Sequence, residues 1–289
     1  MTQALRLATR GSRQATAQST AVATLIEEYT GCPVELVAIE TTGDIRTDVP
    51  LHVIGGQGVF VKEVQRAVLD GRADLAAHSA KDLPSATTDG LVIGAFCERR
   101  DASDVLIGST LDALPIGATV ATGSVRRRSQ LSLVRPDLQF RELRGNIDSR
   151  LSKIPEGGAV VMAAAALQIL GMLDRVAEVL PYETFVPAVG QGCVAVECRH
   201  DNATAISVLK AIDHAQTRHH VEVERAFLAE LGSGCSLPVG AHATDGALRT
   251  FLADLATGES FSDEVALVGD SSDRDASRRA ALASRAALE

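Results

Sequence analysis

Three turns in this sequence combine a helix-capping side chain with nearby arginines. A helix N-terminus offers unpaired N–H groups and the positive end of the helix dipole, and a guanidinium can bind a carboxylate through two parallel hydrogen bonds. Ordinary caps beside solvated arginines would explain any one turn, but three at equivalent topological positions favour a site for a phosphate or for several carboxylates. The three turns are Arg10-Gly-Ser12, Ser124-Val-Arg126-Arg127, and Arg144-Gly-Asn146 followed by Arg150.

A fourth segment places an acid beside a base directly after an expected buried strand. It is His78-Ser-Ala-Lys81-Asp82-Leu-Pro84. Open α/β sheets place reactive groups at the carboxyl ends of strands, where Lys81 and Asp82 would lie. An aspartate beside a lysine stays ionised near neutral pH, so Asp82 could stabilise a developing cation and relay protons. A structural ion pair explains the two residues equally well, and we expect His78 to be a hydrogen-bonded strand residue.

Five cysteines occur, and no two of them form a C-x-x-C pair. This odd number argues against a disulfide framework and against a zinc ribbon. Cys235 stands out because it lies among small residues in a tight turn over 232–240, which would expose its thiol. A buried structural cysteine is the alternative there. The segment 55–58, Gly-Gly-Gln-Gly, lacks the Gly-Lys-Ser/Thr of a phosphate-binding loop, and we expect a mobile loop.

The composition is that of a globular protein with an aliphatic core. Of the 289 residues, 46% are hydrophobic but only 3% are aromatic, so Val, Leu, Ile and Ala must fill the core. No apolar run approaches the roughly 20 residues that span a bilayer, and the first residues lack the pattern of a secretion signal. We therefore expect a cytoplasmic protein.

The charge is unevenly distributed. The net charge of −9 opposes non-specific binding to nucleic acid or to an anionic membrane. Residues 119–150, in contrast, contain seven arginines against three acidic residues. A cationic patch on an acidic chain suits a small polyanion better than a duplex, whose repeated phosphates would be repelled by the rest of the surface.

The first half of the chain repeats a short aliphatic strand, a polar turn and a helical segment, which predicts an α/β fold. We expect strands over 5–8, 34–39, 74–77, 91–96, 105–107, 119–121, 138–143 and 160–162. We expect helices over 13–29, 147–154 and 163–170, one from Val125, and one with Phe60, Val64, Ala67 and Val68 on its apolar face.

The pattern changes from about His214 to one long helix over 216–231, a strand over 249–255 and a terminal helix after Asp273. Together these elements predict two doubly wound, mostly parallel α/β domains, similar to those of periplasmic binding proteins, that face each other across a cleft. A small α+β third domain completes the prediction.

As a set, nine short strings in this order resemble the porphobilinogen deaminase (hydroxymethylbilane synthase) family, and they extend from about residue 5 to 240. The strings are Leu7-Ala-Thr-Arg10-Gly-Ser12, Thr42-Gly-Asp44, Gly58-Val-Phe-Val-Lys62-Glu63, His78-Ser-Ala-Lys81-Asp82-Leu-Pro84, Gly123-Ser-Val-Arg126-Arg127-Arg128, Leu143-Arg144-Gly-Asn146, Pro187-Ala-Val-Gly-Gln-Gly192, Glu197-Cys-Arg199 and Gly234-Cys235.

The resemblance implies three domains: residues 1–97 with a return segment over 193–212, residues 100–190, and residues 216–289. It implies a dipyrromethane cofactor, joined by a thioether to Cys235, that serves as a primer. Four porphobilinogen molecules would add head to tail with loss of ammonia, and hydrolysis would release hydroxymethylbilane in haem biosynthesis. The family expectation is a monomer.

The resemblance also implies roles for individual residues. Asp82 would be catalytic, because a buried carboxylate can stabilise the cation left when ammonia departs. Each pyrrole carries an acetate and a propionate, which basic side chains would pair. The residues implied to hold the cofactor are Cys235, Lys81, Ser124, Arg126, Arg127 and Arg144, and those implied to hold the substrate are Arg10, Ser12, Arg144, Arg150, Arg199 and Phe60, the last by stacking.

Two positions depart from the family pattern. Gln57 stands where the family usually has lysine, and Ile169 stands where arginine is common. Each change removes a cation, so turnover could be slower or could depend differently on pH. A two-domain binding protein that closes on an anionic ligand is the rival hypothesis from another class, and it would need neither Asp82 nor a free thiol at Cys235.

Overall fold

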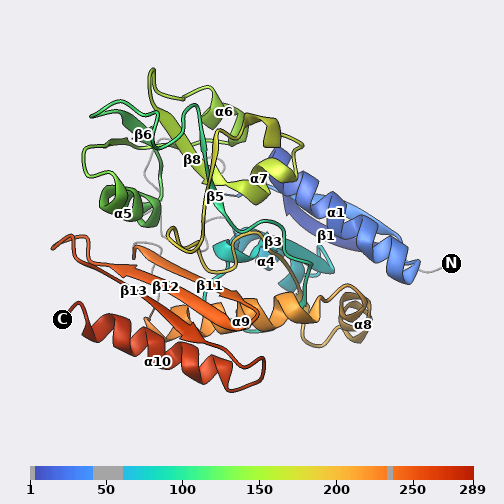
Figure 1. Cartoon of the computed structure of the whole chain (residues 1–289). Coiled ribbons are helices and arrows are strands. Elements are labelled where there is room, and N and C mark those ends of the chain that lie inside the picture. The colour runs from blue at the N-terminus through green and yellow to red at the C-terminus, as the bar shows by residue number, and fades with distance from the viewer. Residues whose placement is uncertain (1–3, 42–60, 233–236) are drawn as a thin grey trace. The chain divides into compact units, whose positions relative to one another are not determined.

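The computed structural model describes residues 4–41, 61–232 and 237–289 (Figure 1). The chain forms two compact units, which are described separately. Unit 1 contains residues 1–99 and 193–219, and unit 2 contains residues 100–192 and 220–289. Among the described residues, no helix is both long enough and apolar enough to cross a membrane.

Unit 1 is built on a five-stranded sheet. Strand β1 runs parallel to β2 and β3, whereas β10 runs antiparallel to both β3 and β4. A short 3-10 helix, η1 (Ala80–Asp82), follows β3 directly. In spatial order the strands are β2 (Val34–Ile39), β1 (Leu5–Arg10), β3 (Leu75–Ser79), β10 (Val194–Arg199) and β4 (Leu91–Phe96).

Helices cover both faces of this sheet, because alternate strand residues point to opposite sides. Leu7 and Leu75 pack with apolar residues of α1 (Arg13–Thr30) and α8 (Ala203–Ala211). Ala8 and Ala76 point the other way and pack against α4 (Lys62–Leu69), which buries Val64, Ala67 and Val68. The predicted apolar face of this helix is therefore confirmed for its described residues.

Unit 2 contains a second five-stranded sheet with the same pattern. Strand β6 is parallel to β7 and β8, and β5 is antiparallel to β8 and β9. In spatial order the strands are β7 (Gln139–Arg141), β6 (Thr119–Ala121), β8 (Ala159–Ala163), β5 (Asp104–Ile107) and β9 (Glu178–Leu180). Helices α6 (Ile147–Leu151) and α7 (Ala164–Gln168) pack on one face and α5 (Val125–Val134) on the other, and η2 (Leu173–Arg175) precedes β9.

A three-stranded antiparallel sheet forms the C-terminal part. Its strands follow chain order: β11 (Val239–Thr244), β12 (Ala247–Ala253) and β13 (Ser260–Ala266). Helices α9 (Ala215–Glu230) and α10 (Asp273–Ala286) lie along one face of this sheet (Figure 1). Their apolar residues, such as Phe227 and Ala281, share one core with Leu248.

The α/β class, with two doubly wound sheets and a small three-stranded sheet, is confirmed. The expectation of mostly parallel pairing needs a correction, because β5 and β10 each run antiparallel to both neighbours. Each is the first strand after the chain passes from one unit to the other. The division into three domains and the facing of two domains across a cleft stay predictions.

Several strand boundaries also differ, and pairing explains the differences. β3 extends to Ser79 because Val194 of β10 pairs with that residue. β7 covers only 139–141, rather than the predicted 138–143, because it pairs on one side with a three-residue strand, β6.

Candidate functional site

The turn between β6 and α5 is capped as predicted. The Ser124 hydroxyl accepts a hydrogen bond from the backbone N–H of Arg127 at 3.4 Å. The N–H of Ser124 itself donates to the Thr122 hydroxyl at 3.1 Å. Ser124 therefore begins a helix whose first turn carries two successive arginines, Arg126 and Arg127.

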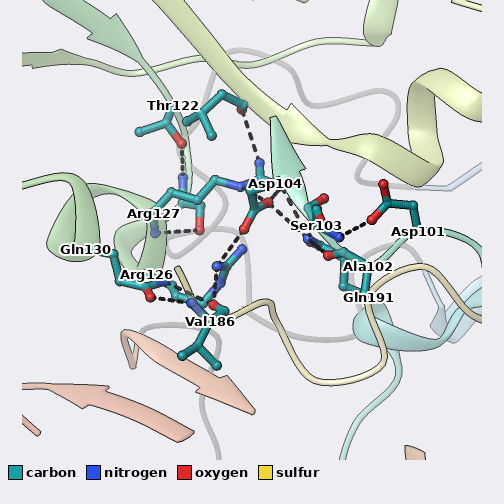
Figure 2. A network of polar contacts seen from close by, with 12 residues as sticks. Asp101, Ala102, Ser103, Asp104, Thr122, Arg126, Arg127, Gln130, Val186 and Gln191 are labelled. Atoms are coloured by element: carbon teal, nitrogen blue, oxygen red, sulfur yellow. Dashed lines mark hydrogen bonds and ion pairs between the residues drawn. The ribbon is translucent and has the colours of Figure 1, made fainter. Parts of the chain in front are cut away.

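Both arginines point at one buried carboxylate, that of Asp104 (Figure 2). Arg127 donates from Nε to Oδ1 at 2.8 Å, and its Nη2 lies 2.7 Å from the same oxygen. Nη1 of Arg126 lies 2.8 Å from Oδ2. Asp104 is fully buried, and both guanidiniums are nearly so. The sequence placed these arginines correctly at a helix start, but it did not indicate their internal partner.

Two glutamines complete this network. Gln191 donates to Oδ1 of Asp104 at 3.0 Å and to the carbonyl of Ala102 at 2.7 Å (Figure 2). Gln130 accepts from the N–H of Val186 at 2.6 Å and donates to its carbonyl at 3.0 Å. That carbonyl also accepts from Nη1 of Arg126 at 2.6 Å. The guanidinium of Arg126 is thereby held between Asp104 and a backbone carbonyl.

The cluster keeps an excess positive charge. Burial alone would raise the pKa of Asp104, but the charges of Arg126 and Arg127 outweigh it and hold that pKa well below the ordinary value of 3.8. Burial lowers the pKa of Arg126, but a guanidinium stays protonated at neutral pH. Two cations therefore face one anion. Among the described residues, Nε and Nη2 of Arg126 have no hydrogen-bond acceptor, so an external carboxylate could be bound there.

The antiparallel direction of β5 explains why Asp104 reaches these arginines. Asp104 is the first residue of β5 and pairs with Ala163, the last residue of β8. The start of β5 thus lies at the sheet edge where β6 and β8 end and where α5 begins. A parallel strand would place its first residue at the opposite edge.

The turn carrying Arg144 lies beside the turn carrying Ser124. A Cβ atom at Gly123 would approach the carbonyl of Leu143 to 2.8 Å, so the two turns touch through their backbones. Asn146 caps α6 by accepting from the N–H of Ser149 at 2.9 Å, as predicted. Nη1 of Arg144 is buried and has no hydrogen-bond acceptor among the described residues. An unpaired buried donor of this kind indicates a missing acceptor.

Arg150 lies in the last turn of α6 and donates from Nε to the carbonyl of Gly145 at 2.8 Å. This bond ties it to the same turn as Arg144. The structure therefore brings together four of the predicted basic residues of unit 2 at one edge of its sheet: Arg126, Arg127, Arg144 and Arg150.

In unit 1, the predicted residues lie at the carboxyl ends of β1 and β3, which are neighbours. Arg10 is the last residue of β1, and the Ser12 hydroxyl caps α1 by accepting from the N–H of Ala15 at 3.3 Å. Lys81 and Asp82 lie in η1, between the buried side chains of Ala80 and Leu83. The N–H of Ala80 donates to the carbonyl of Cys193 at 2.9 Å, which ties this turn to β10.

The structure does not bring Arg199 to these residues. β10 runs antiparallel to β3, so Arg199, at its carboxyl end, lies at the opposite edge of the sheet from Asp82. Its guanidinium donates to both carboxylate oxygens of Asp201, at 2.8 and 2.6 Å. We therefore leave Arg199 out of the proposed binding set.

Three further predictions concern residues outside the described ones: the cofactor cysteine Cys235, the stacking residue Phe60 and the loop residue Gln57. The other four cysteines are buried and form no disulfide with one another, as expected for structural thiols. Ile169 directly follows α7.

Sequence reasoning missed Asp104 and Gln191 as members of the site. The only local signal for Asp104 is a single acidic residue that opens an apolar strand. Gln191 was part of a family string but had no role of its own. Both act through contacts with residues at least 22 positions away in sequence, which no local pattern shows.

Comparison with protein families identifies the class to which this site belongs. Residues 5–207 match the family model described as "Porphobilinogen deaminase, dipyromethane cofactor binding domain", and residues 219–270 match "Porphobilinogen deaminase, C-terminal domain". An α/β protein with an arginine-rich edge in unit 2 agrees with this description. The chain belongs to the porphobilinogen deaminase family, as the sequence resemblance predicted.

Individual relatives agree. The chain is 48% identical to porphobilinogen deaminase of Nitratidesulfovibrio vulgaris (strain DSM 19637 / Miyazaki F), over 87% of this chain and 83% of the relative. It is 48% identical to porphobilinogen deaminase of Brevibacillus brevis, over 73% of this chain and 70% of the relative. A probable porphobilinogen deaminase of Methanopyrus kandleri is 45% identical, over 84% and 83%.

Solved structures of lower similarity were also found. The methionine-binding protein MetQ is 14% identical with a TM-score of 0.46, over 74% of this chain and 91% of that protein. The periplasmic VFT2 domain of Bordetella pertussis BvgS is 17% identical with a TM-score of 0.43, over 72% and 86%.

The pairing of Asp104 generates a test of stability. Asp104→Asn should lower the free energy of unfolding at pH 7 by about 3–5 kcal/mol, because it leaves two buried guanidiniums without an anion. The pKa of Asp104 is lower in the folded than in the unfolded chain. The difference in the free energy of unfolding between wild type and variant should therefore have its full value above about pH 5. It should shrink as the pH falls to about 4 and below. Urea unfolding at several pH values measures it.

Asp137→Asn is the matched control, since Asp137 accepts from Arg135 in the same unit but near the surface. It should change stability far less, because water screens that pair. Equal losses in the two variants, or a pH-independent loss for Asp104→Asn, would contradict the proposed charge balance of the cluster.

Proposed function

We propose that this protein polymerises four porphobilinogen molecules head to tail, with release of ammonia, onto a covalently bound dipyrromethane primer. It then hydrolyses off hydroxymethylbilane, a step of tetrapyrrole (haem) biosynthesis. Membership of the porphobilinogen deaminase family supports this activity. The cytoplasmic location and the monomeric state stay predictions of the sequence.

One observation supports the proposal most strongly: Arg126 and Arg144 in unit 2 have hydrogen-bond donors for which the described residues provide no acceptor. The two guanidiniums around Asp104 leave one positive charge, and a buried Nη1 of Arg144 has no acceptor among the described residues. The acetate and propionate groups of pyrroles supply the acceptors that these donors lack. The residues present therefore fit the dipyrromethane that the family implies.

We assign a role to each predicted residue of the site. The helix start at Ser124 offers the positive end of a dipole to the same carboxylates as the arginines. Phe60 and Cys235, for stacking and for thioether attachment, are assigned from the family resemblance alone. The cofactor's carboxylates would be held by Lys81, Ser124, Arg126, Arg127 and Arg144, and those of the substrate by Arg10, Ser12, Arg144 and Arg150.

When bound, the dipyrromethane would supply the terminal pyrrole carbon that attacks the first substrate unit, and each later unit would be attacked by the ring added before it. Asp82 performs the proton chemistry around that attack. The substrate's C–N bond breaks as its amine leaves with a proton as ammonia, and the carboxylate of Asp82 stabilises the cation left on the substrate. After the new C–C bond has formed, Asp82 would accept the proton released from the ring carbon that made the attack. Its place in a 3-10 turn between two buried residues restricts its side chain for this task.

A binding protein that only closes on an anionic ligand is the alternative. Its sheets and its capped helix starts would look the same. It would bind porphobilinogen or a similar anion without consuming it, so turnover separates the two hypotheses.

Asp82→Asn tests the catalytic assignment. The amide can neither carry the negative charge nor accept a proton, so tetrapyrrole formation should fall by at least about 100-fold. The fold should be retained because the side chains change little in size. The rate of product formation and the thermal unfolding temperature should be measured on the same preparation.

Asp89→Asn is the control for this variant, since Asp89 lies exposed in the segment that follows the same turn. Its activity should equal that of the wild type. Normal turnover by Asp82→Asn would overturn the assignment of Asp82.

The intact mass of the purified protein tests the cofactor. An excess of two linked pyrrole units should be found, should map to the peptide containing Cys235 and should be lost in Cys235→Ala. Cys198→Ala should keep the excess, because burial, and then the charge of Glu197, raises the pKa of the Cys198 thiol to about 11 and leaves it unreactive. A folded, unmodified chain that porphobilinogen cannot prime would favour the binding protein.

A further inference from the structure

A second buried carboxylate, that of Glu197, lies in unit 1 and has no part in the assignments above. Glu197 is on β10, with its side chain 1% exposed. Its Oε2 accepts a hydrogen bond from Nε2 of Gln65, on α4, at 2.8 Å. The same oxygen lies 3.0 Å from Nε2 of His78, on β3. Gln65 in turn accepts from the hydroxyl of Thr88 at 3.1 Å.

These contacts depend on the carboxylate. A buried carboxylate is costly unless donors or cations surround it, and here an amide and an imidazole do so. The contact of His78 has the distance of an ion pair but not the geometry of a hydrogen bond, so Nε2 of His78 has no hydrogen-bond partner among the described residues. The attraction to Glu197 is therefore the main polar interaction of this ring nitrogen.

The polar contacts that link His78, Glu197, Gln65 and Thr88 connect the two sides of the turn that carries Asp82. His78 lies four residues before Asp82, at the end of β3, and Thr88 lies six residues after it. The carbonyl of Thr88 accepts from the N–H of Leu91, where β4 begins. Both the segment that enters the turn and the segment that leaves it are thus bound, directly or through Gln65, to one carboxylate.

The orientation of each group in this chain is determined by its neighbour. The Gln65 amide accepts from Thr88 through Oε1, so its Nε2 must face Glu197. Loss of the negative charge would weaken the attraction of both groups, the amide of Gln65 and the ring of His78, to this oxygen. The turn between them would then be free to shift.

We propose that Glu197 is a positioning residue for Asp82, acting through His78 on one side of the turn and through Gln65 and Thr88 on the other. This inference rests on the proposed function of Asp82. Displacement of a reacting group by about 1 Å can cost about 100-fold in rate. The carboxylates of the substrate are assigned to other residues, so substrate binding should change little.

The test uses the full, primed chain and porphobilinogen as substrate. Glu197→Gln should lower kcat by about 10- to 100-fold while KM stays within about threefold of the wild type. Thr88→Val removes only the hydrogen bond from Thr88 to Gln65 and should lower kcat by a smaller factor than Glu197→Gln does. This second variant keeps the test decisive if Glu197→Gln does not fold.

His78 offers a pair of variants that separates positioning from packing. His78→Gln keeps a polar N–H group near the position of Nε2, where it is still attracted to the carboxylate, and should retain most of kcat. His78→Leu fills similar space without a polar group and should lose it. Asp74→Asn is the matched control. Asp74 binds Arg6 by hydrogen bonds of 2.8 to 3.1 Å at the other end of β3, so its loss should lower thermal stability without changing kcat per folded molecule.

The outcomes are distinct. Unchanged kcat in folded Glu197→Gln or His78→Leu, beside an active wild type, would overturn the inference and leave the proposed function intact. A loss of stability alone, equal to that in Asp74→Asn, would also overturn it. Failure of the primed wild type to form any tetrapyrrole would overturn the proposed function and this inference with it.

Discussion

The ion cluster of Asp104 with Arg126 and Arg127 is the constraint on which the proposed site depends. One buried carboxylate fixes two guanidiniums, because each of its oxygens lies within 2.8 Å of a different arginine. The same carboxylate leaves one positive charge uncompensated. A site with two carboxylates would be neutral, and a site with none could not keep two guanidiniums buried side by side. The cluster thus fixes both guanidiniums and keeps one positive charge, to which we assign the binding of an anion.

The two five-stranded sheets share one strand arrangement, and we propose a different role for the buried acid of each. In the spatial order of each sheet, an antiparallel strand lies next to three parallel strands. This strand is the first one after the chain has passed from the other unit, and it carries a buried carboxylate, Glu197 in β10 and Asp104 in β5. Asp104 opens its strand, so it lies at the edge where helices begin and pairs with arginines of α5. Glu197 lies within its strand and pairs with His78 and Gln65. In the roles we propose, the position of the acid along the strand separates anion binding from positioning of a turn.

The sequence predicted the features that depend on contacts between residues close together in the chain, such as helix caps. The caps Ser12, Ser124 and Asn146 are all confirmed, because a cap is a contact across three positions. The strand-to-helix alternation was predicted for the same reason. The sequence did not predict the direction of β5, because strand direction depends on pairing between distant segments. For the same reason, Asp104 was missed as the partner of Arg127. Arg199 shows the same limit: its string matched the family, but only the register of β10 shows that it lies at the other edge.

The measurement that tests this account most directly is an experimental structure of the primed full chain. The account predicts that a carboxylate of the dipyrromethane accepts hydrogen bonds from Nε or Nη2 of Arg126 and from Nη1 of Arg144, while Asp104 keeps both of its arginines. A bound dipyrromethane whose carboxylates lie only on other cations, with these donors bonded to water, would contradict it.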